Sequence, residues 1–222
     1  MHHRRFFLRR SFYSAIAAGL GLSACDRPAS EPAAAGAVPK AGARSVPIVL
    51  ATWAPNTKAC AAAWEVLADG GRALDAVEAG ARIPEADPED TSVGYGGLPD
   101  RNGVVTLDAC IMDERGNAGS VTFLQHIMHP VSVARRVLEA TPHVMLSGEG
   151  ALQFALAQGF KKENLLTDRA RQAWEEWKAD NYQGPRVSPA QHDTIGLLAI
   201  DQRGDISGAC TTSGAAFKYH GR

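Results

Sequence analysis

The chain has 222 residues, of which 45% are hydrophobic and 21% are charged. This length and apolar content suffice for one or two domains with a sizeable core. The formal net charge at pH 7 is −1, so the sequence lacks the basic excess typical of proteins that bind nucleic acid.

The first 24 residues predict an export signal. Four arginines within residues 1–10 precede a short apolar run rich in alanine and glycine that ends at Ala24, and such a run is too short to span a bilayer stably. Arg9 and Arg10, followed by Ser-Phe, resemble a twin-arginine signal. Residues 22–25, Leu-Ser-Ala-Cys, resemble a bacterial lipobox. We therefore expect an exported, periplasmic lipoprotein with Cys25 lipidated; the alternative is an ordinary signal peptide with an incidental cysteine.

Residues 25–45 are rich in Ala, Pro and Gly, a composition that predicts a flexible tether. Removal of the leader takes away four arginines and no acidic residue, so the remaining chain is acidic. The other cysteines, Cys60, Cys110 and Cys210, are odd in number and lie in predicted helices and strands. We expect small buried apolar residues there and no disulfide framework. We expect no metal and no cofactor.

Along residues 46–222, apolar runs predict strands at 46–52, 104–112, 119–124, 195–200 and 206–212. Helical periodicity predicts five helices. The first begins at residues 56–57, the second covers 73–82 and ends before Pro84, and the third begins at Pro130. The fourth covers 150–157, and the fifth begins at Asp168, which we expect to be its N-cap. The last helix carries Trp174 and Trp177, which we interpret as packing residues. Strands that are apolar throughout, alternating with amphipathic helices, predict an α/β protein whose sheets are covered on both faces.

Residues 92–97, Ser-Val-Gly-Tyr-Gly-Gly, hold three glycines in six positions. Such a loop allows the backbone to approach a neighbouring group closely, although an ordinary glycine turn has the same composition.

Thr194 lies where a polar segment with two prolines, residues 180–189, leads toward a strand. A threonine hydroxyl is a weak nucleophile unless a base stands beside it, and an N-terminal threonine supplies that base with its own α-amine, whose pKa is about 8. This chemistry requires a cut between Asp193 and Thr194, in which a neighbouring carboxylate can assist proton transfer. A solitary Asp-Thr pair before a strand is, by itself, more often an ordinary loop.

Seven short stretches together resemble the glycosylasparaginase family of N-terminal-nucleophile hydrolases. They are residues 192–196 (His-Asp-Thr-Ile-Gly), 207–214, 220–222 (His-Gly-Arg), 92–97, 99–100, 107–109 and 142–146. The resemblance covers roughly residues 46 to 222.

This resemblance implies a four-layer α-β-β-α sandwich, incomplete in this chain. Residues 46–193 would belong to an α-subunit, and residues 194–222 would begin a β-subunit. The full-length protein would be an α/β heterodimer that dimerises. Its substrate would be a small molecule, an asparagine whose side-chain amide carries N-acetylglucosamine. Thr194 would attack the amide carbon and form an aspartyl ester, which water then hydrolyses.

The resemblance also implies roles for other residues. Thr212 would bond the hydroxyl of the nucleophile, and Arg222 would bind the α-carboxylate of the substrate. Trp53 would line the pocket. Asp193, with His192 and Ser92 in support, would act in self-processing. Each has a plainer alternative, such as a strand-end threonine, a terminal arginine or a core tryptophan.

The family pattern continues beyond the position of Arg222, including the donors that stabilise the oxyanion, and each such donor contributes about 3 to 4 kcal/mol. We therefore expect this chain to be a fragment, inactive and poorly folded alone, with unpaired sheet edges. Two other functions stay open. One is an isoaspartyl peptidase or asparaginase of the same superfamily, which usually carries Gly-Thr-Val-Gly at the cut. The other is a membrane-tethered binding lipoprotein without catalysis.

Overall fold

The computed structural model describes residues 46–53, 56–179 and 194–222. These residues all belong to one structural unit that begins at Arg44. The predicted leader and tether with Cys25 lie outside the described residues, as do His192 and Asp193.

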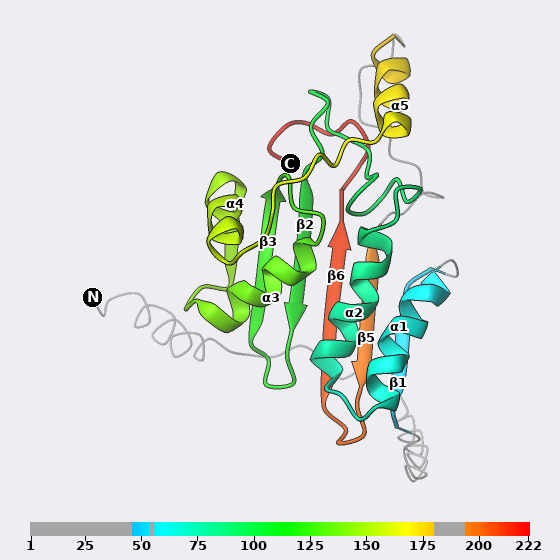
Figure 1. The fold of residues 1–222 in the computed structure, drawn as a ribbon, viewed down its shortest axis with the longest axis vertical. Coiled ribbons are helices and arrows are strands. Elements are labelled where there is room, and N and C mark those ends of the chain that lie inside the picture. Colours follow the sequence, from blue (N-terminus) through cyan, green and yellow to red (C-terminus); the bar gives the residue numbers. More distant parts are fainter. Residues whose placement is uncertain (1–45, 54–55, 180–193) are drawn as a thin grey trace, which may run out of the picture. The chain divides into compact units, whose positions relative to one another are not determined.

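The unit is organised around a six-stranded sheet with the order β1-β5-β6-β2-β3-β4 (Figure 1). The strands are β1 (Ile48–Ala51), β2 (Leu107–Met112), β3 (Ala118–Leu124), β4 (Met145–Ser147), β5 (Ile195–Ile200) and β6 (Ile206–Thr212). Neighbours pair antiparallel except β3 and β4, which are parallel. The β5–β6 hairpin, which follows the predicted cut, is thereby inserted between β1 and β2, which precede it.

Two hairpin turns join β2 to β3 and β5 to β6, and an aspartate closes each of them. Asp113 Oδ1 accepts hydrogen bonds from the backbone N–H groups of Arg115 at 2.9 Å and Asn117 at 2.8 Å. Asp201 Oδ1 accepts equivalent bonds from residues 203 and 205 at 2.9 Å and 3.2 Å. Aspartate favours turns because its side chain can bond the backbone two residues further on.

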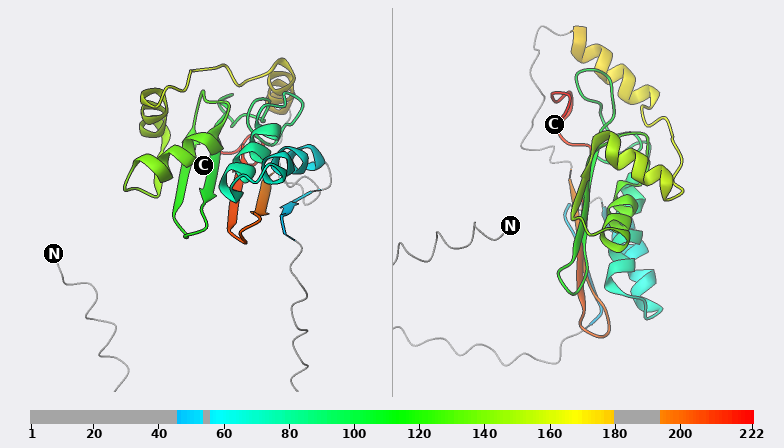
Figure 2. Two further views of the ribbon diagram at one scale, coloured as in Figure 1. Left: turned by 60° about the horizontal axis from the view of Figure 1, so that its bottom comes forward. Right: turned by 90° about the vertical axis from the view of Figure 1, so that its left-hand side faces the viewer.

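Helices α1 (Thr57–Ala68), α2 (Ala73–Glu85), α3 (Pro130–Ala140) and α4 (Gly148–Ala157) lie on one side of the sheet, as the edge-on view in Figure 2 shows. Strand side chains alternate between faces. On β5, for example, Ile195, Leu197 and Ala199 are buried and face the helices. Together with the small and branched residues of α1–α4 they form the main core.

The other face of the sheet carries no helix among the described residues. It exposes large apolar side chains of four strands: Leu50, Met112, Leu198 and Ile206. The mixed α/β class predicted from the sequence is confirmed. The described residues supply one sheet and one helical layer, so the four-layer sandwich stays a prediction.

Two local predictions were wrong, and one strand was missed. Helix α2 does not stop before Pro84 but continues to Glu85, because the Glu85 side chain is held by buried hydrogen bonds. The start of α5 (Asp168–Ala179) is capped by Thr167, whose Oγ1 accepts from the Ala170 N–H at 3.2 Å. The short strand β4 was not predicted, because three residues carry too little periodicity.

The cysteine prediction was also wrong. Cys110 and Cys210 are exposed, and Cys60 is half-buried. Strand alternation places both exposed cysteines on the sheet face that no described helix covers.

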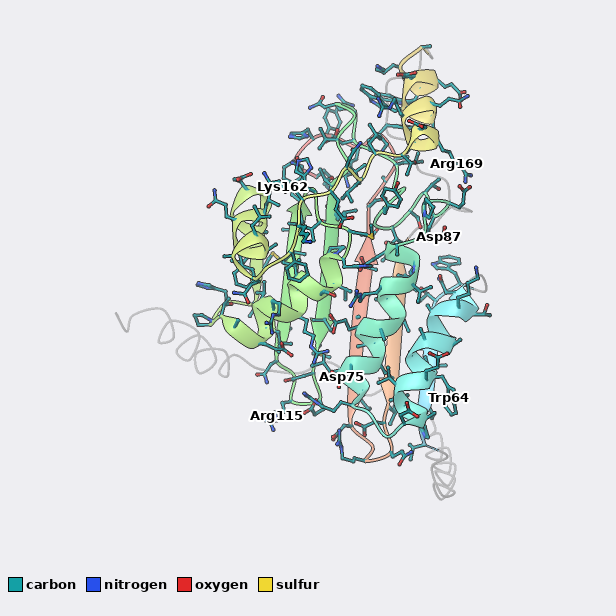
Figure 3. The ribbon with its side chains drawn as sticks, in the orientation of Figure 1. Trp64, Asp75, Asp87, Arg115, Lys162 and Arg169 are labelled. Carbon is teal, nitrogen blue, oxygen red and sulfur yellow. The ribbon has the colours of Figure 1, made fainter. Side chains whose placement is uncertain are left out.

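Ionic contacts join neighbouring elements on the helical side. Arg135 of α3 contacts Asp75 and Glu78 of α2 at 2.6 Å each, and Glu139 at 2.8 Å. Figure 3 shows Asp75 on α2 and Arg115 at the tip of the β2–β3 hairpin. It also labels Arg169 on α5, which contacts Glu89 at 2.5 Å. Within the described ranges, no helix is long and apolar enough to cross a membrane.

Candidate active site

Thr194 lies directly before β5, and the end of β1 holds its backbone. The Thr194 carbonyl accepts a hydrogen bond from Trp53 Nε1 at 3.2 Å and from Thr52 Oγ1 at 3.4 Å. Thr52 Oγ1 in turn accepts from the Gly196 N–H at 2.9 Å. Trp53 has φ 68°, an uncommon backbone conformation for a bulky residue. The backbone of the candidate nucleophile Thr194 is thus hydrogen-bonded to the end of the edge strand β1. Thr194 itself is exposed.

A row of polar residues crosses the open face at this end of the sheet. Ile195 pairs with Thr211 and Asp108 pairs with Thr212, so continuation of the β5–β6 register by one residue places Thr194 opposite Thr212. Directly opposed residues on one face have Cβ atoms about 4.5 to 5.5 Å apart. The order across three strands is therefore Thr194, Thr212, Asp108.

Asp108 is held by bonds from β3. Its Oδ1 accepts from Thr122 Oγ1 and from the Phe123 N–H, each at 2.8 Å. Thr212 Oγ1 accepts from the Gly214 N–H at 2.9 Å. A hydroxyl that accepts this bond keeps its own proton free to donate to a neighbour.

A cavity of about 330 Å³ lies over this row. Thr194, Thr212, Asp108 and Arg222 all contribute to its lining. The structure thus brings the candidate nucleophile, the second threonine and the candidate carboxylate-binding arginine to one hollow. Trp53 reaches the site through its bond to the Thr194 carbonyl.

The segment that carries Arg222 is anchored by buried polar groups. Asp100 is fully buried, and its Oδ2 lies 2.5 Å from His220 Nδ1. Lys218 is buried and donates from Nζ to the carbonyls of Thr106, at 3.1 Å, and Ser213. Burial lowers the pKa of Lys218, while the nearby charges of Asp108 and Asp100 act in the opposite sense. These contacts hold the segment between Thr212 and Arg222, two residues that line the cavity.

Helix α5 packs against the segment that leads to Arg222. Trp177 is buried and stacks on Phe217 with ring centroids 4.9 Å apart. Trp174 Nε1 donates to the Arg101 carbonyl at 3.1 Å. The prediction that both tryptophans are packing residues is confirmed.

The glycine-rich loop at residues 92–97 packs against the residue that follows Thr212. The Ser213 N–H donates to the Ser92 carbonyl at 2.6 Å. A Cβ on Gly97 would lie 2.6 Å from Ser213 Cβ, so the close approach predicted for this loop is present. The Ser92 hydroxyl donates to Asp90 Oδ1 at 2.5 Å. Ser92 therefore contacts the residue next to Thr212 through its backbone carbonyl.

Glu85 fixes the same region from the helical side. It is fully buried, and its Oε1 accepts from Thr211 Oγ1 at 2.7 Å and from the Val131 N–H at 3.0 Å. Its Oε2 lies 3.2 Å from His129 Nδ1. Burial raises the pKa of Glu85, against the opposing effect of these hydrogen bonds. One carboxyl group thus joins α2, α3 and the strand residue before Thr212.

Comparison with known proteins identifies the family of the chain. Residues 34–222 match the family model described as "Asparaginase". The chain belongs to the asparaginase family. Among its relatives is the N(4)-(beta-N-acetylglucosaminyl)-L-asparaginase of Elizabethkingia miricola, which is 60% identical over 176 residues, covering 79% of this chain and 52% of that protein.

The mouse and rat proteins of the same name are 38% and 36% identical, over 82% of this chain and 61% of each protein. Recognition of the glycosylasparaginases from sequence motifs is therefore confirmed. This member of the asparaginase family spans between 52% and 61% of the length of these three relatives.

Sequence reasoning missed several residues of the site. Thr52 and Asp108 were not proposed, although Asp108 lies within the motif 107–109 that carried the resemblance. Strand alternation could have found it, because it is a polar residue between buried Leu107 and Ala109. His192 and Asp193 lie outside the described residues. In the part of the chain that the structure describes, no cluster of three or more His, Cys, Asp or Glu side chains could hold a metal ion.

Proposed function

We propose that this protein, at the length of its relatives, is a glycosylasparaginase. It hydrolyses the amide bond between an asparagine side chain and N-acetylglucosamine. The observation that carries the proposal is the cross-strand row of Thr194 and Thr212 beneath a cavity that Arg222 also lines. The names of the relatives support the substrate class.

In this proposal a cut between Asp193 and Thr194 frees the Thr194 α-amine. The amine takes the hydroxyl proton as Oγ1 attacks the amide carbon, and the sugar leaves as a glycosylamine. Water then hydrolyses the aspartyl ester, with the same amine as base, and releases aspartate. The Thr212 hydroxyl accepts a hydrogen bond from the Gly214 N–H and donates its own proton to the nucleophile.

Arg222 binds the α-carboxylate of the substrate, since a guanidinium forms a paired set of hydrogen bonds with a carboxylate. Among the described residues Trp53 does not line the cavity of about 330 Å³ and contacts the site through its bond to the Thr194 carbonyl; that it forms a wall of the complete pocket is part of the proposal. Asp193 acts before the cut, when its carboxylate assists the shift of the peptide bond to Thr194 Oγ1. His192 and Ser92 support that step, and the Ser92 contribution runs through the backbone bond to Ser213.

The test is an intact-mass spectrum of the full-length protein, with Thr194→Ala and Thr194→Ser as matched variants. We expect a break between Asp193 and Thr194 in the unaltered protein, none in the alanine variant and a slow one in the serine variant. The processed protein should then release aspartate from the glycosylated asparagine. A folded protein that stays uncut would overturn the mechanism and favour the binding lipoprotein.

One observation favours a second activity, because the matching family is described as asparaginase. The same assay should therefore include free asparagine and a β-aspartyl dipeptide. Faster hydrolysis of either than of the glycosylated asparagine would move the assignment to an asparaginase or isoaspartyl peptidase.

The remaining proposals concern assembly and location. Residues 1–24 direct export, Cys25 receives a lipid, and the cut protein is an α/β heterodimer that dimerises in the periplasm. Metabolic labelling with a fatty acid should be lost in Cys25→Ser, and size-exclusion chromatography with light scattering should give the mass of two heterodimers. An unlabelled protein that stays soluble would contradict the anchor.

A further inference from the structure

Thr212, the candidate partner of the nucleophile, is the last residue of β6. The sheet ladder therefore supports it from one side only, and a strand end without further contacts frays. Strand alternation points the Thr212 side chain toward the candidate cavity and the preceding Thr211 side chain toward the helices. A group that holds Thr211 on the helical side thus also fixes the position of Thr212.

Glu85 holds Thr211 from that side. Its Oε1 accepts the Thr211 hydroxyl proton at 2.7 Å, and the same oxygen accepts from the Val131 N–H at the start of α3. All three residues are buried between β6 and the helices. These contacts therefore do not depend on what covers the other face of the sheet.

The Glu85 backbone also reaches the chain beyond the end of β6, through the glycine-rich loop. The Glu85 carbonyl accepts from the Tyr95 N–H at 2.7 Å, and a Cβ on Gly94 would overlap that carbonyl oxygen. The loop in turn accepts the Ser213 N–H at the Ser92 carbonyl, at 2.6 Å. One residue thus contacts the last turn of the strand directly and the residue after the strand through one loop.

We propose that Glu85 is a positioning residue that fixes Thr212, and through it the hydroxyl of Thr194. This role rests on the proposed function, in which Thr212 donates a hydrogen bond to the nucleophile. Glu85 does not touch the substrate, because it is buried on the helical side of the sheet. It acts on geometry, and a displacement of about 1 Å at a reacting group can slow a reaction about 100-fold.

Such a role should change kcat and leave KM nearly unchanged. Arg222, which the proposed function assigns to the carboxylate of the substrate, follows a segment that Asp100 and Lys218 hold by separate contacts. Loss of the Glu85 bond therefore leaves substrate binding in place and removes an interaction made in the transition state. A loss of that kind lowers kcat and kcat/KM together.

The test uses the full-length protein with glycosylated asparagine, at a temperature where near-UV circular dichroism shows every variant to be folded, and kcat is counted per processed molecule. We expect Glu85→Ala and Thr211→Val each to lower kcat and the rate of self-cleavage at least ~10-fold, with KM changed less than ~3-fold. Glu85→Gln and Thr211→Ser keep the hydrogen bond, so both should retain kcat within ~3-fold of the unaltered protein.

A double variant and a distant control separate positioning from loss of stability. Glu85→Ala and Thr211→Val remove the same bond, so together they should lower kcat no more than the worse of the two alone. Arg135→Met breaks ionic contacts between α3 and α2 and should keep kcat within ~2-fold. Losses that multiply in the double variant, unchanged kcat in both single variants, or an equal loss in Arg135→Met would each overturn the proposal.

Hydrogen exchange gives a readout that does not need activity. If the unaltered protein is folded but neither cuts itself nor hydrolyses the substrate, the proposed function fails, and exchange at the Ser213 N–H decides whether Glu85 holds the end of β6. We expect this exchange to be at least ~10-fold faster in Thr211→Val than in Thr211→Ser, with no change in the β2–β3 hairpin. Equal exchange in the two variants would refute the positioning role.

Discussion

Glu85 offers the sharpest test of how the fold supports the candidate site. Its carboxyl group is fully buried and makes three hydrogen bonds, to Thr211, Val131 and His129. Replacement by alanine leaves the Thr211 hydroxyl and the Val131 N–H buried without this acceptor. Each such loss costs about 1 to 3 kcal/mol, and the cavity adds to it. We expect Glu85→Ala to lower the free energy of unfolding by about 3 to 5 kcal/mol.

The matched variant is Glu85→Gln. Its amide oxygen can accept from Thr211 and Val131, and its amide nitrogen can donate to the His129 ring, as a protonated carboxyl group would. We therefore expect a loss of about 1 kcal/mol or less. Urea unfolding followed by tryptophan fluorescence measures both variants. In thermal unfolding the alanine variant should melt roughly 10 °C lower, because 1 kcal/mol corresponds to about 2 to 4 °C at this chain size.

The two side chains also differ in their response to pH. Burial raises the pKa of Glu85 above its ordinary value of 4.5. A raised folded-state pKa contributes stability that is fully present below the unfolded-state pKa and is lost as pH rises through the folded-state pKa. The unaltered protein should therefore lose stability relative to Glu85→Gln as pH rises above 4.5. Equal losses in the alanine and glutamine variants, or a difference that does not change with pH, would refute this reasoning.

The remaining predictions concern close packing and ion pairing. Gly97→Ala should destabilise the protein by about 2 kcal/mol and slow any self-cleavage, because its Cβ would overlap Ser213. Gly150→Ala, where a Cβ meets nothing within 4 Å, is the control, and chemical denaturation compares the two. Arg135→Met should cost about 2 kcal/mol, because three carboxylates would lose their shared partner. Arg136→Met, at an exposed single pair, should change stability by less than about 1 kcal/mol in the same experiment.

Local sequence signals predicted most elements of this fold. The turns at Asp113 and Asp201 follow from the side-chain chemistry of aspartate, and Pro130 marks the start of α3. The position of Thr194 at the entrance to a strand was predicted from the change between a polar segment and an apolar run. These signals depend on neighbours a few residues apart, so the sequence alone suffices to find them.

Contacts between distant segments could not be predicted in the same way. Glu85 lies in a stretch of prolines and acidic residues that indicates an exposed loop, yet it is buried because α3 and β6 supply its partners. The exposure of Cys110 and Cys210 depends on which sheet face the helices cover. The row from Thr194 to Asp108 depends on the register of three strands. Nothing in the local pattern near these residues specifies that register.

The strand order gives the predicted cut a mechanical consequence. The β5–β6 hairpin lies between β1 and β2 and is hydrogen-bonded to both. Hydrolysis of one peptide bond before Thr194 therefore changes the connectivity of the chain without removing either ladder. The two products would behave as one body in a native separation and as two in a denaturing gel. They could separate only by opening two ladders of the sheet at once, so we expect the two pieces to stay together after the cut until the fold itself is lost.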